Sequence, residues 1–580
     1  MLLPERSLTE NVPNATIIIM KTLVFAGAAL TCGVLFGGNS FRVTPYVQRP
    51  QQHAMTVMWL AQESGEATIE YWKDGTAHTN ILVSVHRPDL SADVSGMRFG
   101  SDNRLEYCLA PELGYDCGTV KDDNARNRCG AWEMQFTTPW QYRVRLTGLE
   151  ADSLYRYRVC LKGGASYENG FRTVPSADGW REFKFIYYSD SETEPQDNLK
   201  DRGCTTDWTD PATGRDRTYF ATQTEAYAAN IRAAVDFGAE LIVMAGDLAQ
   251  KGSRQCDWDE FWRHNAGPLN DPAGSIPVVA SPGNHDYWDF GDGGNVAISK
   301  YLSYFEYEPN GAAVGVRQRE LFHRVDYGPV AFLFMDACNG NDAALAEDTS
   351  RYLHRTDADG SQGGCIAPDF NPGSAQYRWL EAQLKDAQRN KAFTFVVSHQ
   401  CPYSCGAHGG PIGELGNKEK LDFQSGRALR VLVPLFHKYG VDGWFCGHDE
   451  MMERSEVQGF EVKPDGTKVP HAFCVWDMGI AGDGLRGYEM YPNPYERYRA
   501  HANCPEVYKD GVLVAGGKHY GHLRVSIDRN ADGRWRATFD PVYVFFSRDA
   551  HGRVSFGGVR HYDDRVVRLS SRRCGESLRR

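Results

Sequence analysis

The first part of the chain contains short segments in which apolar and polar residues alternate. "AMTVMWLA" at 54–61 and "ATIEYW" at 67–72 have this pattern, and "QYRVRLTGLEADSLYRYRVCL" at 141–161 holds two further segments. Side chains of a strand point alternately to its two faces, so the pattern indicates strands with one buried face. Residues 41–178 are therefore predicted to form an all-β sandwich, with an insertion at about 88–140.

From residue 183 onward the apolar residues occur in short continuous runs. The runs are "FKFIYY", "ELIVMA", "IPVVA", "VAFLFMD", "AFTFVVS" and "VDGWFC". Such runs are typical of strands that are covered on both faces. Helical spacing of apolar residues occurs between them at 219–238, 374–390 and 425–440. Strand and helix alternate, which predicts an α/β domain over 179–455 whose sheets are flanked by helices.

The last part of the chain returns to alternating segments, "HLRVSID", "RWRATFD" and "VYVFFSR". These segments indicate antiparallel strands, so residues 456–580 are predicted to form a β-rich completion of the α/β domain and a tail. "DRNADG" at 528–533 resembles a calcium-binding loop, but it lacks the later Glu of an EF-hand. A hairpin turn is the favoured interpretation, and a calcium site is the alternative.

Residues 1–40 are predicted to form a leader. "MKTLVFAGAALTCGVLFGG" at 20–38 has one leading Lys, an apolar run of about 15 residues and a small-residue end, as a secretory signal peptide does. Translation is expected to begin at Met20, because the preceding residues are unusual before a signal. An N-terminal membrane anchor is the alternative. The protein is expected to be secreted, periplasmic or extracellular, with no membrane span after signal removal.

The cysteine content also indicates an exported protein. The chain has 15 cysteines, and removal of Cys32 with the signal leaves an even number. This number is consistent with up to about seven disulfides in an exported protein. Cys401 with Cys405 and Cys108 with Cys117 are candidate pairs, and buried free thiols are the alternative.

The charge of the chain restricts its partners. The formal net charge is −12 and the isoelectric point is near 5.8. Binding to a phosphate backbone requires a basic surface, so nucleic acid is not expected to be the main partner. A small anionic substrate would need a local positive centre, such as metal ions.

Polar clusters follow five of the predicted strands. They are Ser189 to Glu192, Gly246-Asp247, Gly283 to Asp286, Ser398-His399 and Gly447 to Glu450. Carboxylate, amide and imidazole groups gathered at one edge of a sheet supply ligands for divalent metals, and the Gly residues permit tight turns. A single cluster of this kind is usually a surface turn, but five after successive strands indicate one site.

The order of these clusters is similar to that of the calcineurin-like metallophosphoesterases, whose pattern is D-x-H, G-D, G-N-H-[DE], H and G-H-x-H. "SHQCPYSCGAHGG" at 398–410 resembles the "HHPPYSSGNHGS" segment of the purple acid phosphatase branch. "TGLEADSLYRYRV" at 147–159 resembles the end of a fibronectin type III domain, with its tyrosine corner. The resemblance implies a fibronectin-like sandwich followed by an α/β metallophosphoesterase sandwich.

The resemblance also implies a site for two metal ions. Asp190 would bind the first ion, Asp247 would bridge both, and Asn284, His399 and His448 would hold the second. Paired ions of this kind lower the pKa of a bound water, so that hydroxide attacks the phosphorus. His285 and His408 match histidines that contact the phosphate or protonate the leaving group.

Three positions depart from the family pattern. Glu192 and Glu450 stand where histidines would bind the first metal, and Gln250 stands where purple enzymes have an iron-binding tyrosine. If both glutamates coordinate, the first site has oxygen ligands only, which suit Ca, Mg, Mn or Fe. The second site suits Zn, Mn or Fe. A role for either Glu without metal contact is the alternative.

The resemblance implies an exported phosphatase that hydrolyses small phosphate monoesters. A phosphodiesterase or nucleotidase is the alternative within this chemistry, because the metal core does not set the leaving group. A surface-binding or adhesion protein with an inactive phosphoesterase scaffold is the alternative from another class.

Overall fold

The computed structural model describes 16 segments of the chain between residues 39 and 573. They are 39–85, 97–99, 105–107, 140–176, 181–193, 203–210, 215–287, 295–312, 317–338, 367–410, 426–483, 489–500, 507–510, 512–515, 519–548 and 554–573, together with Leu485. Residues 39–580 form one compact unit. Most of the predicted leader and most of the predicted insertion lie outside the described residues.

The N-terminal region is a sandwich of two antiparallel sheets, as the alternating pattern predicts. One sheet has the order β1-β2-β7, formed by Phe41–Gln48, Ala54–Ala61 and Trp140–Thr147. The other has the order β4-β3-β8-β9, formed by Thr79–Val83, Ala67–Trp72, Leu154–Leu161 and Ser166–Arg172. A short hairpin pairs β5 (Met97–Phe99) with β6 (Leu105–Tyr107).

A tyrosine fixes the turn that enters β8. The Tyr155 hydroxyl accepts a hydrogen bond from the backbone N–H of Glu150 at 2.9 Å. This contact is the one expected of a tyrosine corner in sandwich domains. In the sandwich core the rings of Trp59 and Tyr142 stack at 5.3 Å.

Residues 183–573 form two large sheets. The first has the order β14-β13-β10-β24-β25-β26, with β27 also paired to β25. Its strands are Val278–Ser281, Leu241–Ala245, Phe183–Tyr188, Gly521–Arg529, Arg534–Arg548, Val554–His561 and Val566–Arg573. The C-terminal strands thus extend the sheet that begins with β10. Residues 530–533 form the turn between β24 and β25, which agrees with a hairpin turn in "DRNADG".

The second sheet has the order β15-β16-β17-β18-β20-β19-β21. Its strands are His323–Tyr327, Val330–Phe334, Phe393–Gln400, Gly443–Gly447, Lys468–Met478, Met452–Val462 and Glu496–Arg499. The two sheets meet through aromatic rings. Phe185 of β10 lies edge-on to Phe332 of β16 at 4.9 Å and lies 5.9 Å from Phe395 of β17. Such contacts bury large apolar areas between the sheets.

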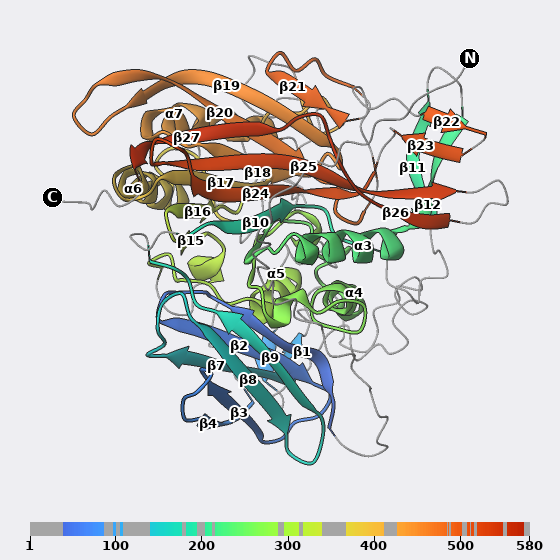
Figure 1. Ribbon diagram of the computed structural model, residues 1–580, viewed down its shortest axis with the longest axis vertical. Helices are drawn as coiled ribbons and strands as arrows, with labels where there is room; N and C mark the ends of the chain where they lie inside the picture. Colours follow the sequence, from blue (N-terminus) through green and yellow to red (C-terminus); the bar gives the residue numbers. More distant parts are fainter. Residues whose placement is uncertain are drawn as a thin grey trace, which may run out of the picture. The chain divides into compact units, whose positions relative to one another are not determined.

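The helices flank these sheets. They are α3 (Gln223–Asp236), α4 (Gln255–Asn265), α5 (Asn295–Tyr304), α6 (Ala375–Asn390) and α7 (Val433–Tyr439). α3 lies along β24 and β25, whereas α6 and α7 lie against the second sheet (Figure 1). The 3-10 helices are Pro272–Gly274, His285–Tyr287, Arg317–Glu320 and Gly426–Leu432. Two hairpins pair β11 (Gly203–Asp210) with β12 (Arg215–Thr222) and β22 (Val507–Lys509) with β23 (Val512–Ala515).

One predicted helix differs from expectation. The pattern at 425–440 predicts a single helix, but residues 426–432 form a 3-10 helix and α7 begins only at Val433. Pro434 lies in the first turn of α7, where its missing N–H is tolerated. In a continuous helix it would remove an interior hydrogen bond.

The cysteine prediction is wrong at the one candidate pair that the structure describes. Cys401 and Cys405 are both free. The Cys401 thiol donates to the Tyr403 carbonyl at 3.4 Å, whereas the Cys405 sulfur lies 3.0 Å from the Arg499 guanidinium. The two side chains therefore face different neighbours despite their short spacing. Cys108 and Cys117 lie outside the described residues.

In the part of the chain that the structure describes, no helix is both long and apolar enough to cross a membrane.

The sandwich is joined tightly to the two large sheets. β2 is buried along its whole length, and Val43, Met58 and Leu60 belong to the same core as the strands of the first large sheet. The buried Tyr157 hydroxyl donates to the Gly274 carbonyl at 2.7 Å. The sandwich is therefore a rigid support for the sheets.

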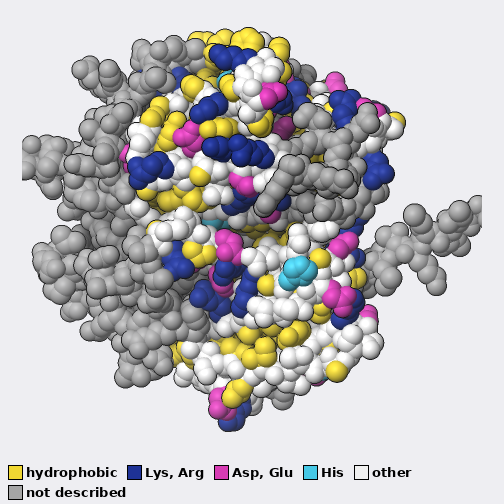
Figure 2. Space-filling view, turned by 90° about the vertical axis from the view of Figure 1, so that its left-hand side faces the viewer, with side chains coloured by type: hydrophobic (Ala, Val, Ile, Leu, Met, Phe, Trp, Pro, Cys, Tyr) yellow, Lys and Arg dark blue, Asp and Glu magenta, His cyan; other side chains and the backbone are white. Residues whose placement is uncertain are grey.

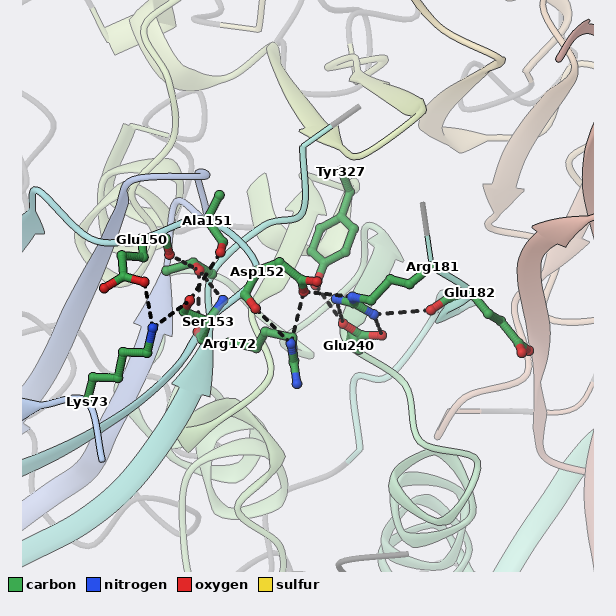
Figure 3. Close-up of polar contacts among 11 residues, drawn as sticks. Lys73, Glu150, Ala151, Asp152, Ser153, Arg172, Arg181, Glu182, Glu240 and Tyr327 are labelled. Carbon is green, nitrogen blue, oxygen red and sulfur yellow. Dashed lines mark hydrogen bonds and ion pairs between the residues drawn. The ribbon is translucent and has the colours of Figure 1, made fainter. Parts of the chain in front are cut away.

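Arg181 connects this support to the strands that lead to the polar clusters (Figure 3). Its guanidinium donates twice to Glu240, at 2.6 Å each, and once to Asp152 of the sandwich, also at 2.6 Å. Glu240 directly precedes β13, and Arg181 itself lies two residues before β10. Bidentate contacts between Arg and a carboxylate are among the stronger polar interactions in proteins.

We expect Arg181→Gln to lower the free energy of unfolding by about 1.5–3 kcal/mol, because it removes charge-assisted bonds to two partly buried carboxylates. The matched control is Arg172→Gln, which removes an ion pair with the Asp152 carboxylate and a hydrogen bond to the Asp152 carbonyl, both within the sandwich. That change should cost less than about 1 kcal/mol. Urea unfolding of both variants measures the difference, and equal losses would contradict a special role of Arg181.

Candidate metal centre

The five polar clusters lie at the same edge of the two large sheets. β10, β13 and β14 run parallel to one another, and so do β16, β17, β18 and β20. Asp190, Asp247 and Asn284 directly follow strands of the first sheet or lie in the turn after them. His399 lies near the end of β17, and His448 follows β18. Parallel strands bring these ends together, as the sequence predicts.

One group consists of Asp247, His399 and His448. His399 Nε2 lies 2.8 Å from Asp247 Oδ2 and 3.2 Å from His448 Nδ1. All three side chains are buried, and one ligand atom of each lies within 4.8 Å of the other two. His399 Nδ1 donates to the Ala245 carbonyl at 2.7 Å, which directs Nε2 toward Asp247. Metal-binding histidines are typically oriented by such a contact.

The other groups share Glu192. One contains Glu192, Asp247 and His285, and another contains Glu192, Glu450 and Asp483, each within the same 4.8 Å limit. Glu192 is 1% exposed, and neither of its carboxylate oxygens has a hydrogen-bond partner among the described residues. A buried polar group without a partner is costly, so this carboxylate fits a site that receives a cation.

Asp190 and Asn284 also lie in this region, but they are not members of these groups. Both oxygens of Asp190 accept the backbone N–H of His448, at 2.9 and 3.1 Å. Asn284 is 2% exposed, and its Oδ1 has no hydrogen-bond partner in the described part of the chain. The ligand roles of these two residues, like those of the grouped residues, stay predictions.

The two candidate catalytic histidines lie beside these groups and are half-buried. His285 Nδ1 donates to the Gln250 carbonyl at 2.9 Å, and its backbone N–H donates to Asp247 Oδ1 at 2.8 Å. The His408 ring lies 3.9 Å from the His448 ring, and its backbone N–H donates to Asp449 at 2.8 Å. Both rings therefore adjoin the Asp247, His399 and His448 group.

The backbone at this edge is strained. Asp190, Asp247, His448 and Glu450 have φ values of 59°, 49°, 80° and 48°. This left-handed region is unusual for residues other than Gly, and it costs on the order of 1 kcal/mol or more at each residue. Strain at four neighbouring candidate ligands indicates that the turns are shaped to direct these side chains.

Two glycines allow the turns to approach one another. A Cβ on Gly447 would lie 2.2 Å from Asp190 Oδ2, and a Cβ on Gly283 would lie 2.2 Å from Asp247 Oδ1. Both separations are shorter than any non-bonded contact. Any larger residue at either position would displace a candidate ligand.

The charges of the centre are unbalanced. Burial, followed by the charges of Asp247, Asp483, Asp190 and Glu450, raises the pKa of Glu192 well above its usual value. Burial also raises the pKa of Asp190 to about 6. Burial would lower the pKa of His399, but Asp247 raises it to about 9. Burial and the neighbouring carboxylates therefore favour proton binding by these groups, and a bound cation would compete with the protons.

Asp483 was not predicted from the sequence. It follows β20 in "MGIAGDG" at 478–484, an apolar strand end followed by a Gly-Asp-Gly turn. This is the same local pattern as in the predicted clusters. It was not recognised because the pattern lies after the last family motif, within the region 456–580 that is predicted to be a β-rich completion of the domain.

A family model described as calcineurin-like phosphoesterase matches residues 203–450. The protein contains a calcineurin-like phosphoesterase domain. The matched range includes the buried Asp247, His399 and His448 group. Asp190, Glu192 and Asp483 lie outside it, although the fold brings them to the same edge.

The chain is also similar in sequence to known proteins. Two uncharacterised proteins from strains of Mycobacterium tuberculosis are 25% identical over 321 residues, which cover 54% of this chain and 50% of each relative. The chain thus spans about half the length of these relatives. The Fe(3+)-Zn(2+) purple acid phosphatase 12 of Arabidopsis thaliana is 29% identical over 169 residues, or 27% of this chain and 32% of that protein.

A solved purple acid phosphatase from yellow lupin seeds has the same fold. The TM-score is 0.51 at 14% identity, and the match covers 88% of this chain and 73% of the lupin chain. This likeness agrees with the predicted order of a strand-rich N-terminal region followed by the α/β phosphoesterase sheets.

Removal of divalent metal is expected to lower the thermal stability of the protein, because a bound cation neutralises the buried carboxylates. An ion at 100 times its dissociation constant adds about 2.7 kcal/mol to the free energy of unfolding. Calorimetry of chelator-treated protein with and without Zn²⁺ measures this effect. His399→Ala should remove most of the response. An unchanged midpoint with Zn²⁺, Mn²⁺ and Ca²⁺ would contradict a metal centre.

Proposed function

We propose that the protein is an exported, metal-dependent phosphatase that acts on small phosphate monoesters. The observation that carries this proposal is the group of Asp247, His399 and His448 within the phosphoesterase domain. Carboxylate and imidazole ligands from two facing sheets converge there within 4.8 Å. This donor set suits a borderline divalent ion.

In this proposal two ions occupy the centre. Asp247, Asn284, His399 and His448 hold the ion on the imidazole side, where Zn, Mn or Fe fits. Asp190, Glu192 and Glu450 hold the other ion with Asp247, where Ca, Mg, Mn or Fe fits. When bound, the ions supply positive charge for the phosphoryl oxygens and lower the pKa of water. The name of the Arabidopsis relative, which gives iron and zinc, supports a mixed pair.

The chain's own residues would position the substrate. The Gln250 carbonyl accepts from His285 Nδ1, so that Nε2 carries the lone pair in the neutral ring and the proton in the charged ring. A charged His285 can donate to a phosphoryl oxygen or to the leaving group. His408 lies against the His448 ring and can contact the same phosphate from the other side.

The surface is consistent with a small substrate. On the face shown in Figure 2, basic and acidic side chains are interspersed. Together with the net charge of −12, this distribution favours a small phosphorylated compound over nucleic acid. The predicted signal peptide at 20–38 supports export.

We expect Asn284→Ala to lower kcat/KM for a chromogenic phosphate monoester by about 100-fold, because loss of a metal ligand or its support has effects of this size. Asn371→Ala is the matched control, since Asn371 is buried in the turn before α6 and its side chain donates to Asp369. Circular dichroism shows whether each variant is folded. Unchanged turnover by folded Asn284→Ala would overturn its role.

The same assay separates the alternatives. The monoester and the matching diester are compared after chelation, with each metal restored singly. Faster turnover of the diester would favour a phosphodiesterase or nucleotidase. A lack of turnover with every metal would leave a surface-binding protein as the better interpretation.

A further inference from the structure

We propose that Asp483 joins Glu192 and Glu450 in an all-carboxylate site for a hard divalent cation of the Ca²⁺ and Mn²⁺ class. The inference rests on the proposed function because it extends the carboxylate side of the same centre. It adds a ligand from outside the phosphoesterase motifs. One carboxylate oxygen of each of the three residues lies within 4.8 Å of the others.

Glu192 is the observation that points to a ligand. Its side chain is almost completely buried, and both oxygens have no hydrogen-bond partner among the described residues. Ordinary buried carboxylates accept hydrogen bonds from backbone or side-chain donors. In one of its two groups Glu192 lies with two other carboxylates, those of Glu450 and Asp483, and a cation among them would satisfy all three.

The segment that carries Asp483 is tied to the loop that carries Glu192. The backbone N–H groups of Gly482 and Asp483 both donate to the Asp190 carbonyl, at 2.9 and 3.1 Å. The Ala481 N–H donates to the Ser189 carbonyl at 3.1 Å. These bonds hold the turn after β20 against the turn after β10, and the position of Asp483 does not depend on a flexible loop.

The Asp483 carboxylate is itself oriented. Gln223 Nε2 donates to Asp483 Oδ1 at 2.7 Å. Gln223 is the first residue of α3, whose start is fixed by a capping box between Thr222 and Glu225. Outer hydrogen bonds of this kind commonly hold a metal-binding carboxylate in place.

The donor set selects the class of ion. Three carboxylates without an imidazole or thiolate favour hard cations with oxygen coordination. Zn²⁺ is better matched to the group of Asp247, His399 and His448, which offers two imidazoles. The centre thus has one group with carboxylate ligands only and another group that also offers imidazole nitrogens.

The test is calorimetric titration of the chelator-treated full chain with Ca²⁺ and, in a separate titration, with Zn²⁺. Asp483→Asn should weaken Ca²⁺ binding at least about tenfold, while Zn²⁺ binding is retained. His399→Ala should show the reverse pattern. The matched control is Asp465→Asn, in an exposed turn between β19 and β20, which should change neither affinity.

A second variant tests the same site in case Asp483→Asn does not fold. Gln223→Leu leaves all three carboxylates in place but removes the oriented donor, and it should weaken Ca²⁺ binding several-fold. Equal Ca²⁺ affinity in wild type and both variants would overturn the proposal. Absence of Ca²⁺ and Mn²⁺ binding in the wild type would also overturn it, and would assign the buried Glu192 to a protonated carboxyl. No substrate is used, so a lack of phosphatase activity would be a separate result.

Discussion

The contact between Asp247 and His399 joins the two large sheets at the edge where all candidate ligands lie. Asp247 follows β13 of one sheet and His399 belongs to β17 of the other, and their side chains meet at 2.8 Å. The Ala245 carbonyl, two residues before Asp247, also accepts from the His399 ring. The end of β13 therefore positions both side chains of this contact. Glu192 and His285 form a further group with Asp247.

This contact does not balance the charge of the centre. Carboxylates from four different turns are gathered in a buried region, and the imidazoles near them lie mostly on the side of the second sheet. Uncompensated buried charge is unfavourable, so the folded chain must bind either protons or cations. Burial and then the neighbouring carboxylates raise the pKa of Glu192, and Asp247 raises the pKa of His399 to about 9 against the effect of burial.

The sequence was informative wherever a local pattern decides the structure. Buried strands have continuous apolar runs, and polar residues after them must lie at the sheet edge, so Asp247, His399 and His448 could be placed together. Spacing in sequence could not show side-chain direction. Cys401 and Cys405 illustrate this limit, because a short turn directs their sulfurs to different neighbours.

Asp483 was missed for a different reason. Its place depends on the pairing of β20 beside β18 and on hydrogen bonds to the Asp190 and Ser189 carbonyls, which are almost 300 residues away in sequence. The same dependence explains Glu192 and Glu450. Taken singly, each glutamate indicates only the loss of an imidazole ligand. The fold, however, brings both glutamates to Asp483, a third carboxylate outside the motifs. Two replacements of imidazole by carboxylate beside a third carboxylate are better explained by a changed cation than by a decayed site. A decayed site would not need four strained residues or an oriented Asp483.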